Sequence, residues 1–180
     1  ISFSSLMFYS SVQLDQNLIY FFVIIIASLL CFLFFNFNII PNSKIFLGDA
    51  GSISIGFILS WILILFAENN FIAHPVLAIW IVAYPIFDLI SVVIIRISNR
   101  SNPFYPDQNH LHHLLLNLNI GKKSILSIII AINLFVQISG FYIYQYLGSD
   151  YSIVIFLIYL LIYLSLTRYL FNNYIIKLNN

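Results

Sequence analysis

One apolar run decides the class of fold: residues Leu18–Phe35 read LIYFFVIIIASLLCFLFF. The run carries no charge and, as one helix, is long enough to cross a bilayer core of about 30 Å. The whole chain has the same character, since 62% of its 180 residues are hydrophobic and 7% are charged, against roughly 25% charged residues in soluble domains. This composition excludes a soluble globular domain, a disordered chain and, with Cys31 as the single cysteine, a disulfide-bonded scaffold.

Further apolar segments predict more spans, and these should be helices because open strands leave unpaired backbone groups in lipid. The segment Phe71–Ile97 would be about 40 Å long as a helix at 1.5 Å per residue, so it must tilt or bend, and Pro85 offers a bend. An apolar stretch at residues 1–12 and a start at Ile1 instead of Met indicate a partial N-terminal span and the C-terminal part of a larger protein. We expect a single integral membrane domain over residues 1–180, an all-α polytopic transmembrane helical bundle with full spans at Leu18–Phe35, Ser52–Ala67, Phe71–Ile97, Ser124–Leu147 and Tyr151–Phe171.

The charged residues orient this bundle. Threading five spans leaves only the acidic Asp15, Glu68 and Asp150 on one side and brings every basic residue to the other, which the positive-inside rule makes cytoplasmic. The long connections 36–51 and 98–123 lie on that side, where we expect the chemistry. No basic patch interleaved with aromatics indicates a nucleic-acid partner. The basic residues are Lys44, Arg96, Arg100, Lys122, Lys123, Arg168 and Lys177.

The first long connection ends in Gly48, Asp49 and Gly51 at the start of a span. Glycines let backbone approach a ligand closely, and the free N–H groups of a helix start favour phosphate. Asp49 could hold Mg²⁺, which takes carboxylate and phosphate oxygens together, and Phe46 could stack on a planar base. The alternative is that Asp49 or Ser52 only caps the helix.

The second long connection carries His110, His112 and His113, three of the four histidines of the chain. Imidazoles suit a proton relay or a hydrogen bond to phosphate. Asp107 or Asn109 can cap a short helix here and Gly121 can end it, so we expect an amphipathic helix on the inner membrane surface. A helical projection places Leu111, Leu114, Leu115 and Leu118 on one face, His110, His113 and Asn117 on the opposite face and His112 on a flank, which argues against a three-histidine zinc site.

Several further residues have a structural as well as a functional interpretation. Asp88 lies inside the third span, where a carboxylate either serves the chemistry or pairs with a neighbouring helix. The tyrosines of the fifth span, Tyr163 among them, suit packing better than a site. Lys44 suits a topology anchor better than a ligand contact.

The two connections together resemble a known family. Residues 32–36 (FLFFN), 44–52 (KIFLGDAGS), 85–88 (PIFD) and 106–115 (PDQNHLHHLL) look like the polyprenyl-phosphate N-acetylhexosamine-1-phosphate transferases of glycosyltransferase family 4. The His-Leu-His-His form resembles the undecaprenyl-phosphate GlcNAc-1-phosphate transferase branch. The resemblance runs from Ile1 to about Lys123.

The resemblance implies a bacterial inner-membrane enzyme with its active-site loops and C-terminus in the cytoplasm, and a homodimer is compatible with it. Such enzymes move a HexNAc-1-phosphate from a UDP-sugar to undecaprenyl phosphate with Mg²⁺, or Mn²⁺, and release UMP for cell-envelope polysaccharide synthesis. Asp49 would hold the metal and act in catalysis with His110 and His113. The resemblance assigns substrate binding to Asn36, Lys44, Phe46, Gly48, Gly51, Ser52, Asp107 and His112.

Two departures from the family pattern argue against this interpretation. Gln108 stands where the family usually has Arg, which removes a bidentate phosphate ligand. The paired aspartates of the family are absent, as they would lie upstream of Ile1. The alternatives are a divalent-metal transporter that uses the histidines and a non-catalytic, truncated membrane protein.

Overall fold

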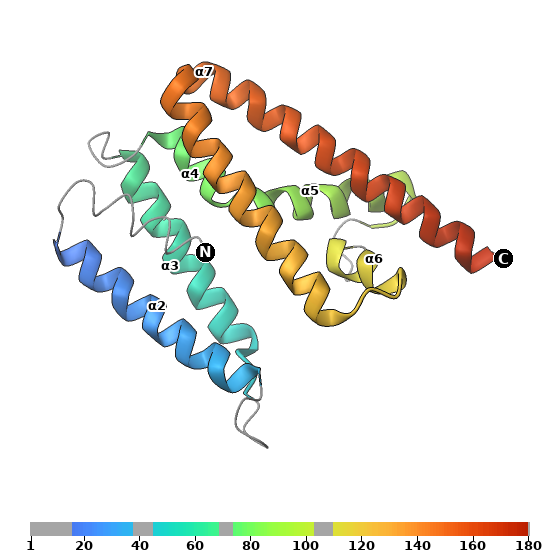
Figure 1. Cartoon of the computed structure of the whole chain (residues 1–180), viewed down its shortest axis with the longest axis horizontal. Coiled ribbons are helices and arrows are strands. Elements are labelled where there is room, and N and C mark those ends of the chain that lie inside the picture. Colours follow the sequence, from blue (N-terminus) through green and yellow to red (C-terminus); the bar gives the residue numbers. More distant parts are fainter. Residues whose placement is uncertain (1–15, 38–44, 69–73, 103–109, 180) are drawn as a thin grey trace. The chain divides into compact units, whose positions relative to one another are not determined.

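The computed structural model describes residues 16–37, 45–68, 74–102 and 110–179 (Figure 1). Within these ranges every regular element is a helix, which confirms the all-α class for the described residues. The chain divides into two compact units, residues 1–81 and 82–180, and each is described by itself. The helices are α2 (Gln16–Asn36), α3 (Gly48–Glu68), α4 (Pro75–Ile81), α5 (Ala83–Ser98), α6 (Leu111–Asn117) and α7 (Lys122–Asn179).

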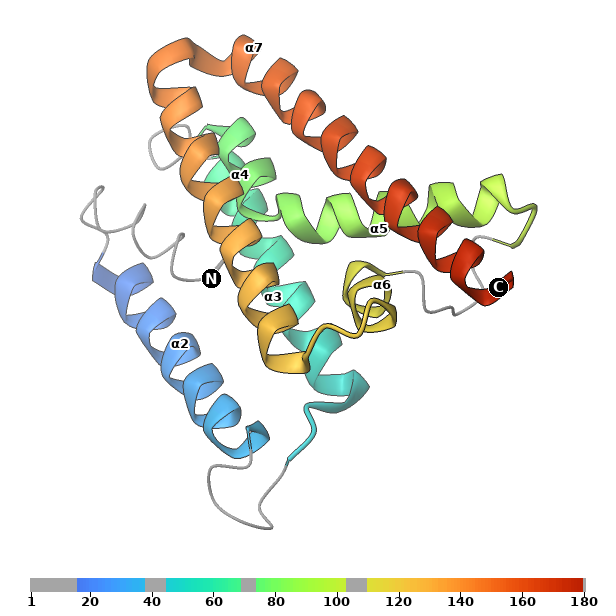
Figure 2. The ribbon, with the colours of Figure 1, turned by 45° about the vertical axis from the view of Figure 1, so that its right-hand side comes forward.

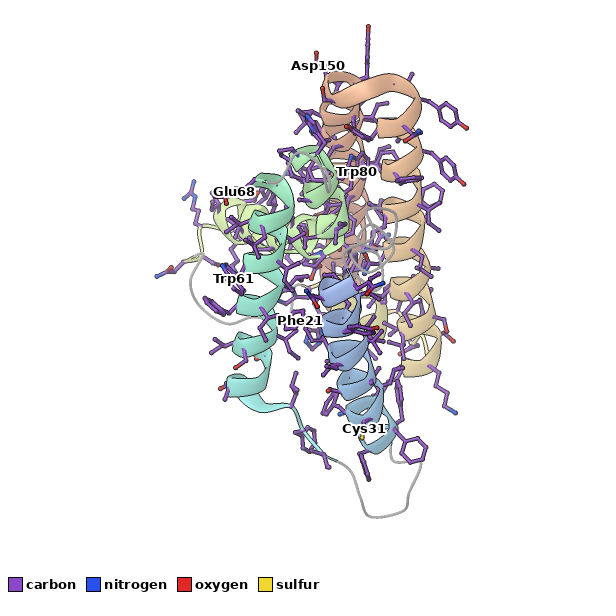
Figure 3. The ribbon with its side chains drawn as sticks, turned by 90° about the vertical axis from the view of Figure 1, so that its left-hand side faces the viewer. Phe21, Cys31, Trp61, Glu68, Trp80 and Asp150 are labelled. Carbon is purple, nitrogen blue, oxygen red and sulfur yellow. The ribbon has the colours of Figure 1, made fainter. Side chains whose placement is uncertain are left out.

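The first unit contains α2, α3 and α4. The long helices α2 and α3 contain spans of 18 residues, Ile19–Asn36 and Gly48–Leu65, that are long and apolar enough to cross a membrane. Most of their side chains are exposed in the chain, including Trp61 on α3 and Cys31 on α2 (Figure 3). Exposed apolar surface of this extent fits contact with lipid or with other membrane helices.

Pro85 explains where the predicted third span breaks. The helix stops at Ile81 and restarts at Ala83, so Pro85 lies in the first turn of α5. Proline has no N–H to donate and its ring clashes with the carbonyl four residues earlier, here that of Ile81. Ile86 resumes the ladder by donating its N–H to the carbonyl oxygen of Val82 at 3.2 Å. The bend expected at Pro85 is therefore found just before it. Helices α4 and α5 are long and apolar enough to cross a membrane only when they are taken together.

Helix α7 doubles back on itself at Gly148, where φ is 81° and ψ is −176° (Figure 2). Only glycine adopts such a conformation at low cost. The two predicted C-terminal spans fall on the two arms, residues 122–147 and 149–179, and the rings of Phe135 and Tyr159 stack across the arms with centroids 6.2 Å apart. By length and composition the described residues hold three candidate spans, α7 counted once, or four with the α4–α5 pair. The expected count of five is not confirmed.

The second unit has its core where α5 and α6 pack on α7. Phe87 of α5 is buried, and its ring centroid lies 5.0 Å from that of Phe156 and 5.8 Å from that of Tyr163. The α7 turn carries Asp150 (Figure 3), whereas Lys122 and Lys123 begin the first arm and Arg168 lies near the end of the second. Within this unit, the basic residues of α7 therefore lie at the opposite end from its acidic turn.

Candidate functional site

The approach to α3 is organised by one side-chain amide. Asn36, the last residue of α2, donates its Nδ2–H to the carbonyl oxygen of Ile45 at 3.0 Å and so ties together the two ends of the connection. The next residue along, Phe46, remains 76% exposed. A large apolar ring held in the open beside a helix start is a suitable surface for stacking on a planar base.

The glycines that follow have separate local roles. Gly48 begins α3 with φ of 68°, in the left-handed region that other residues enter at a cost of about 1–2 kcal/mol. A Cβ on Gly48 would meet no atom within 4 Å, so the space in front of this helix start is open. Gly51 is needed for packing, because a Cβ there would lie 2.8 Å from Cγ of Leu47.

Asp49 lies in the first turn of α3, exposed, and no side chain in the described part of the chain binds its carboxylate. The helix-cap alternative finds no support at either residue. The Ser52 hydroxyl donates to the carbonyl oxygen of Asp49 at 2.9 Å, a bond inside the helix. Mg²⁺ commonly binds to one or two carboxylates together with substrate phosphates, and the hard, exposed oxygens of Asp49 fit such a donor set.

In the second unit three of the described histidines gather near a partly buried carboxylate, that of Asp88. The Nδ1 atom of His110 lies 2.8 Å from Oδ2 of Asp88 on α5. The second oxygen, Oδ1, accepts the backbone N–H of Leu111 at 3.0 Å and the hydroxyl of Tyr163 on α7 at 3.0 Å. Asp88 therefore caps α6, orients His110 and joins three helices.

This cluster corrects the helical projection of the histidines. The helix begins only at Leu111, and His110 is its N-cap residue with extended backbone (φ −64°, ψ 149°), so 100° steps do not apply to it. The His112 ring stacks on the His110 ring with centroids 5.7 Å apart, and it lies tilted by 39° to the His113 ring with centroids 4.1 Å apart. The three imidazoles thus adjoin one another, although the described residues include no group of three or more His, Cys, Asp or Glu side chains arranged to hold a metal ion.

The prediction that four leucines share one face of α6 is confirmed for three of them. Leu111, Leu114 and Leu115 are buried, and α6 packs on α7, so protein covers this face instead of the expected lipid surface. Leu118 is the C-cap residue and is 40% exposed. The expected stop at Gly121 comes earlier, since Asn119 already has φ of 62°.

The electrostatics of the cluster favour a neutral imidazole at its centre. Partial burial, and then the neighbouring His113 and His110, hold the pKa of His112 below its usual 6.5, although the charge of Asp88 opposes this shift. A neutral imidazole offers one N–H donor and one acceptor, which suits hydrogen bonding to phosphate.

The site residues of the sequence therefore fall into two groups. The first unit brings together Asn36, Phe46, Gly48, Asp49, Gly51 and Ser52, and the second brings together His110, His112 and His113. Lys44 and Asp107 lie outside the described residues. The sequence left the role of Asp88 open and suggested only packing for Tyr163. The available signal for Asp88 was a carboxylate inside a predicted span, one helical turn after Pro85.

Comparison with known proteins covers the stretch of sequence that contains the first group. Residues 1–67 match the model of glycosyl transferase family 4. An undecaprenyl-phosphate alpha-N-acetylglucosaminyl 1-phosphate transferase of Haemophilus influenzae is 37% identical over 102 residues, 55% of this chain and 29% of that protein. The protein of the same name from Escherichia coli O157:H7 is 32% identical over 144 residues, 77% of this chain and 39% of that protein.

The resemblance expected from the sequence is thereby confirmed, and the matched stretch spans between 29% and 39% of the length of these two curated relatives. No solved structure matches the chain.

Proposed function

We propose, from the premise that residues 1–67 match glycosyl transferase family 4, that this chain is part of a bacterial membrane enzyme that transfers N-acetylhexosamine 1-phosphate. The donor is a UDP-sugar, the acceptor is undecaprenyl phosphate, and the second product is UMP. An oxygen of the lipid phosphate attacks the β-phosphorus of the UDP-sugar. The bond from that phosphorus to the oxygen bridging the α-phosphate breaks, and its electron pair leaves with UMP.

The observation that carries the proposal is the geometry of the approach to α3, inside the stretch that matches the family. The bond from Asn36 to Ile45 fixes the connection at the point where Phe46 and Asp49 are presented. Phe46 and Asp49 are both exposed, and the space beside Gly48 is open. An aromatic ring, a carboxylate and the N–H groups of a helix start are the groups that a nucleotide diphosphate with its cation requires.

Each residue of this group has a distinct task in the proposal. Phe46 stacks on the uracil, and the N–H groups at the start of α3 donate to phosphate oxygens. Asp49 would hold Mg²⁺, which when bound offsets the negative charge that gathers as two phosphates approach each other. Gly48 keeps a side chain out of this open approach, and Gly51 leaves room for the side chain of Leu47.

The histidine cluster supplies the second set of contacts. Asp88 holds Nδ1 of His110 and leaves the other ring nitrogen for a ligand. His112 and His113 adjoin it, so the cluster can donate or accept several hydrogen bonds at phosphate oxygens. We place both groups at the cytoplasmic membrane surface, on the strength of the positive-inside pattern.

The carboxylate of Asp49 provides the sharpest test. The Asp49→Asn variant of the protein at its full natural length should lose at least a hundredfold in UMP release from UDP-GlcNAc and undecaprenyl phosphate while it still inserts into membranes. Glu68→Gln is the matched control, because Glu68 is an exposed carboxylate at the far end of the same helix, about 28 Å away by helix rise. Near-normal turnover of Asp49→Asn would reject the proposed role of this site.

A metal-transport function finds less support. Transport through the spans requires ionisable groups paired at depth in several helices. Among the described carboxylates, Asp88 is the one that lies inside a span predicted from the sequence, and its oxygens already bind His110, Leu111 and Tyr163.

A further inference from the structure

A pocket of about 250 Å³ lies between α5 and the second arm of α7, within the second unit. Figure 1 shows α5 and this arm crossing each other. None of the histidines of the cluster lines it, and neither does Asp88. The pocket is therefore separate from the candidate functional site, and no step of the proposed transfer uses it.

The inner part of the pocket holds a buried hydroxyl without a partner. Ser91 is 1% exposed and lines the pocket, and its Oγ makes no hydrogen bond in the described structure. The other serines behave differently, since Ser98 and Ser165 donate to carbonyl oxygens of their own helices. A buried hydroxyl without a partner is destabilising, so a ligand that accepts a hydrogen bond from it would remove this cost.

The outer part of the pocket is cationic. Arg168 lines it and is exposed, and no ion pair of its guanidinium occurs among the described residues. Asn99, the C-cap residue of α5, and Asn172 add amide donors at the same end. Ser91 lies about 12 Å from Asn99 along α5 by helix rise, so the pocket runs from a cationic mouth to a deep hydroxyl that lacks a hydrogen-bond partner, that of Ser91.

The walls between these two ends are largely apolar, formed by Ile94, Ile95, Leu161, Leu164 and Phe171. The hydroxyls of Ser98, Ser165 and Thr167 also line the pocket, but each already donates to a carbonyl oxygen of its own helix. A sugar nucleotide would leave its hydroxyl groups unpaired against such walls, and an apolar lipid would leave Arg168 without an anion. The combination fits an amphiphile with one anionic head, apolar chains and a hydrogen-bond acceptor just below the head.

We propose that this pocket binds the headgroup of an anionic glycerophospholipid, with its phosphate at Arg168 and an ester carbonyl as acceptor for Ser91. The ester carbonyl distinguishes this ligand from a polyprenyl phosphate, whose hydrocarbon chain offers no acceptor below the phosphate. The bound lipid would join α5 to α7, the two helices that hold Asp88 and Tyr163 around His110.

Native mass spectrometry of the detergent-solubilised protein at its full natural length tests this inference. Phosphatidylglycerol should bind at least tenfold more tightly than phosphatidylcholine, inorganic phosphate or undecaprenyl phosphate at this site. Arg168→Gln should weaken phosphatidylglycerol binding at least tenfold. Lys122→Gln, which removes an exposed cation of the same helix outside the pocket, should leave it unchanged.

A second pair of variants protects the test against a folding defect. Ser91→Ala keeps the pocket open and should weaken phosphatidylglycerol binding severalfold without lowering the melting temperature of the lipid-free protein, because it deletes an unpaired hydroxyl. Ser91→Leu should abolish the binding by filling the space. Binding of phosphatidylglycerol that is unaffected by both Arg168→Gln and Ser91→Leu would overturn the inference, as would a preference for undecaprenyl phosphate that Arg168→Gln removes.

Discussion

Replacement of Asp88 by asparagine should remove the bond that orients His110 while it leaves the rest of the fold intact. The carboxylate accepts three hydrogen bonds, from Nδ1 of His110 at 2.8 Å, from the N–H of Leu111 at 3.0 Å and from the hydroxyl of Tyr163 at 3.0 Å. An asparagine oxygen can still accept from Leu111 and Tyr163. Its NH₂ group then faces His110, whose Nδ1 can no longer donate and must change tautomer.

The size of the effect follows from the bond that is lost. A hydrogen bond to a charged group contributes about 1.5–3 kcal/mol, which corresponds to roughly a tenfold to hundredfold change in rate. We therefore expect kcat/KM of Asp88→Asn to fall by about that factor. The melting temperature should change little, because two of the three bonds to the side chain persist.

The assay is transfer of radiolabelled N-acetylglucosamine 1-phosphate from UDP-GlcNAc to undecaprenyl phosphate, with Asp150→Asn at the exposed α7 turn as the control. If Asp88 acts through His110, then Asp88→Asn should cost less than twofold in a His110→Ala background. Independent, multiplicative losses in the double variant would refute the positioning role, and so would full activity of Asp88→Asn.

Three more outcomes follow from the same geometry. His113→Ala should lower kcat/KM at least tenfold, about 1.4 kcal/mol, without loss of membrane insertion; unchanged kinetics would leave the cluster with a structural role alone. Since the pKa of His112 is held below 6.5 by burial and by its neighbouring imidazoles, the unfolded chain binds more protons below pH 6.5 and stability falls as the pH is lowered through that window; melting curves in detergent should show this, and His112→Gln should flatten the slope. Gly48→Ala should lower stability by about 1–2 kcal/mol because of its positive φ, and Gly48→Asn by less, since asparagine tolerates this conformation; equal stability of the two variants would contradict a backbone origin.

The sequence predicted the helices well because apolar runs and helix breakers are local signals. The run Leu18–Phe35 lies within α2, and the two C-terminal runs fall on the arms of α7 on either side of Gly148. Pro85 indicated a bend, and the break appears where its ring meets the carbonyl of the preceding turn. The number of spans was less accessible, because α7 counts as one helix although it carries two predicted spans, and the broken pair α4–α5 is long enough to span only when its two helices are taken together.

The site was predictable only where its geometry is local. The open approach beside Gly48 and the exposure of Asp49 follow from glycine spacing at a helix start. The bonds from Asp88 to His110 and Tyr163 join residues that are 22 and 75 positions apart, and periodicity carries no information on such contacts. The projection of His110 was wrong for a related reason, since tertiary capping by Asp88 starts α6 one residue later than the pattern suggested.

Cysteine labelling tests most directly the claim that both groups of residues serve one nucleotide. In a cysteine-free background that includes Cys31→Ser, single cysteines at Ala50 and at Leu118, both exposed, report on the Asp49 group and on the histidine cluster. A membrane-impermeant maleimide should modify both positions from the cytoplasmic side alone, and UDP-GlcNAc should protect both at the same concentration. Labelling of the two positions from opposite faces of the membrane, or protection of only one of them, would contradict the account.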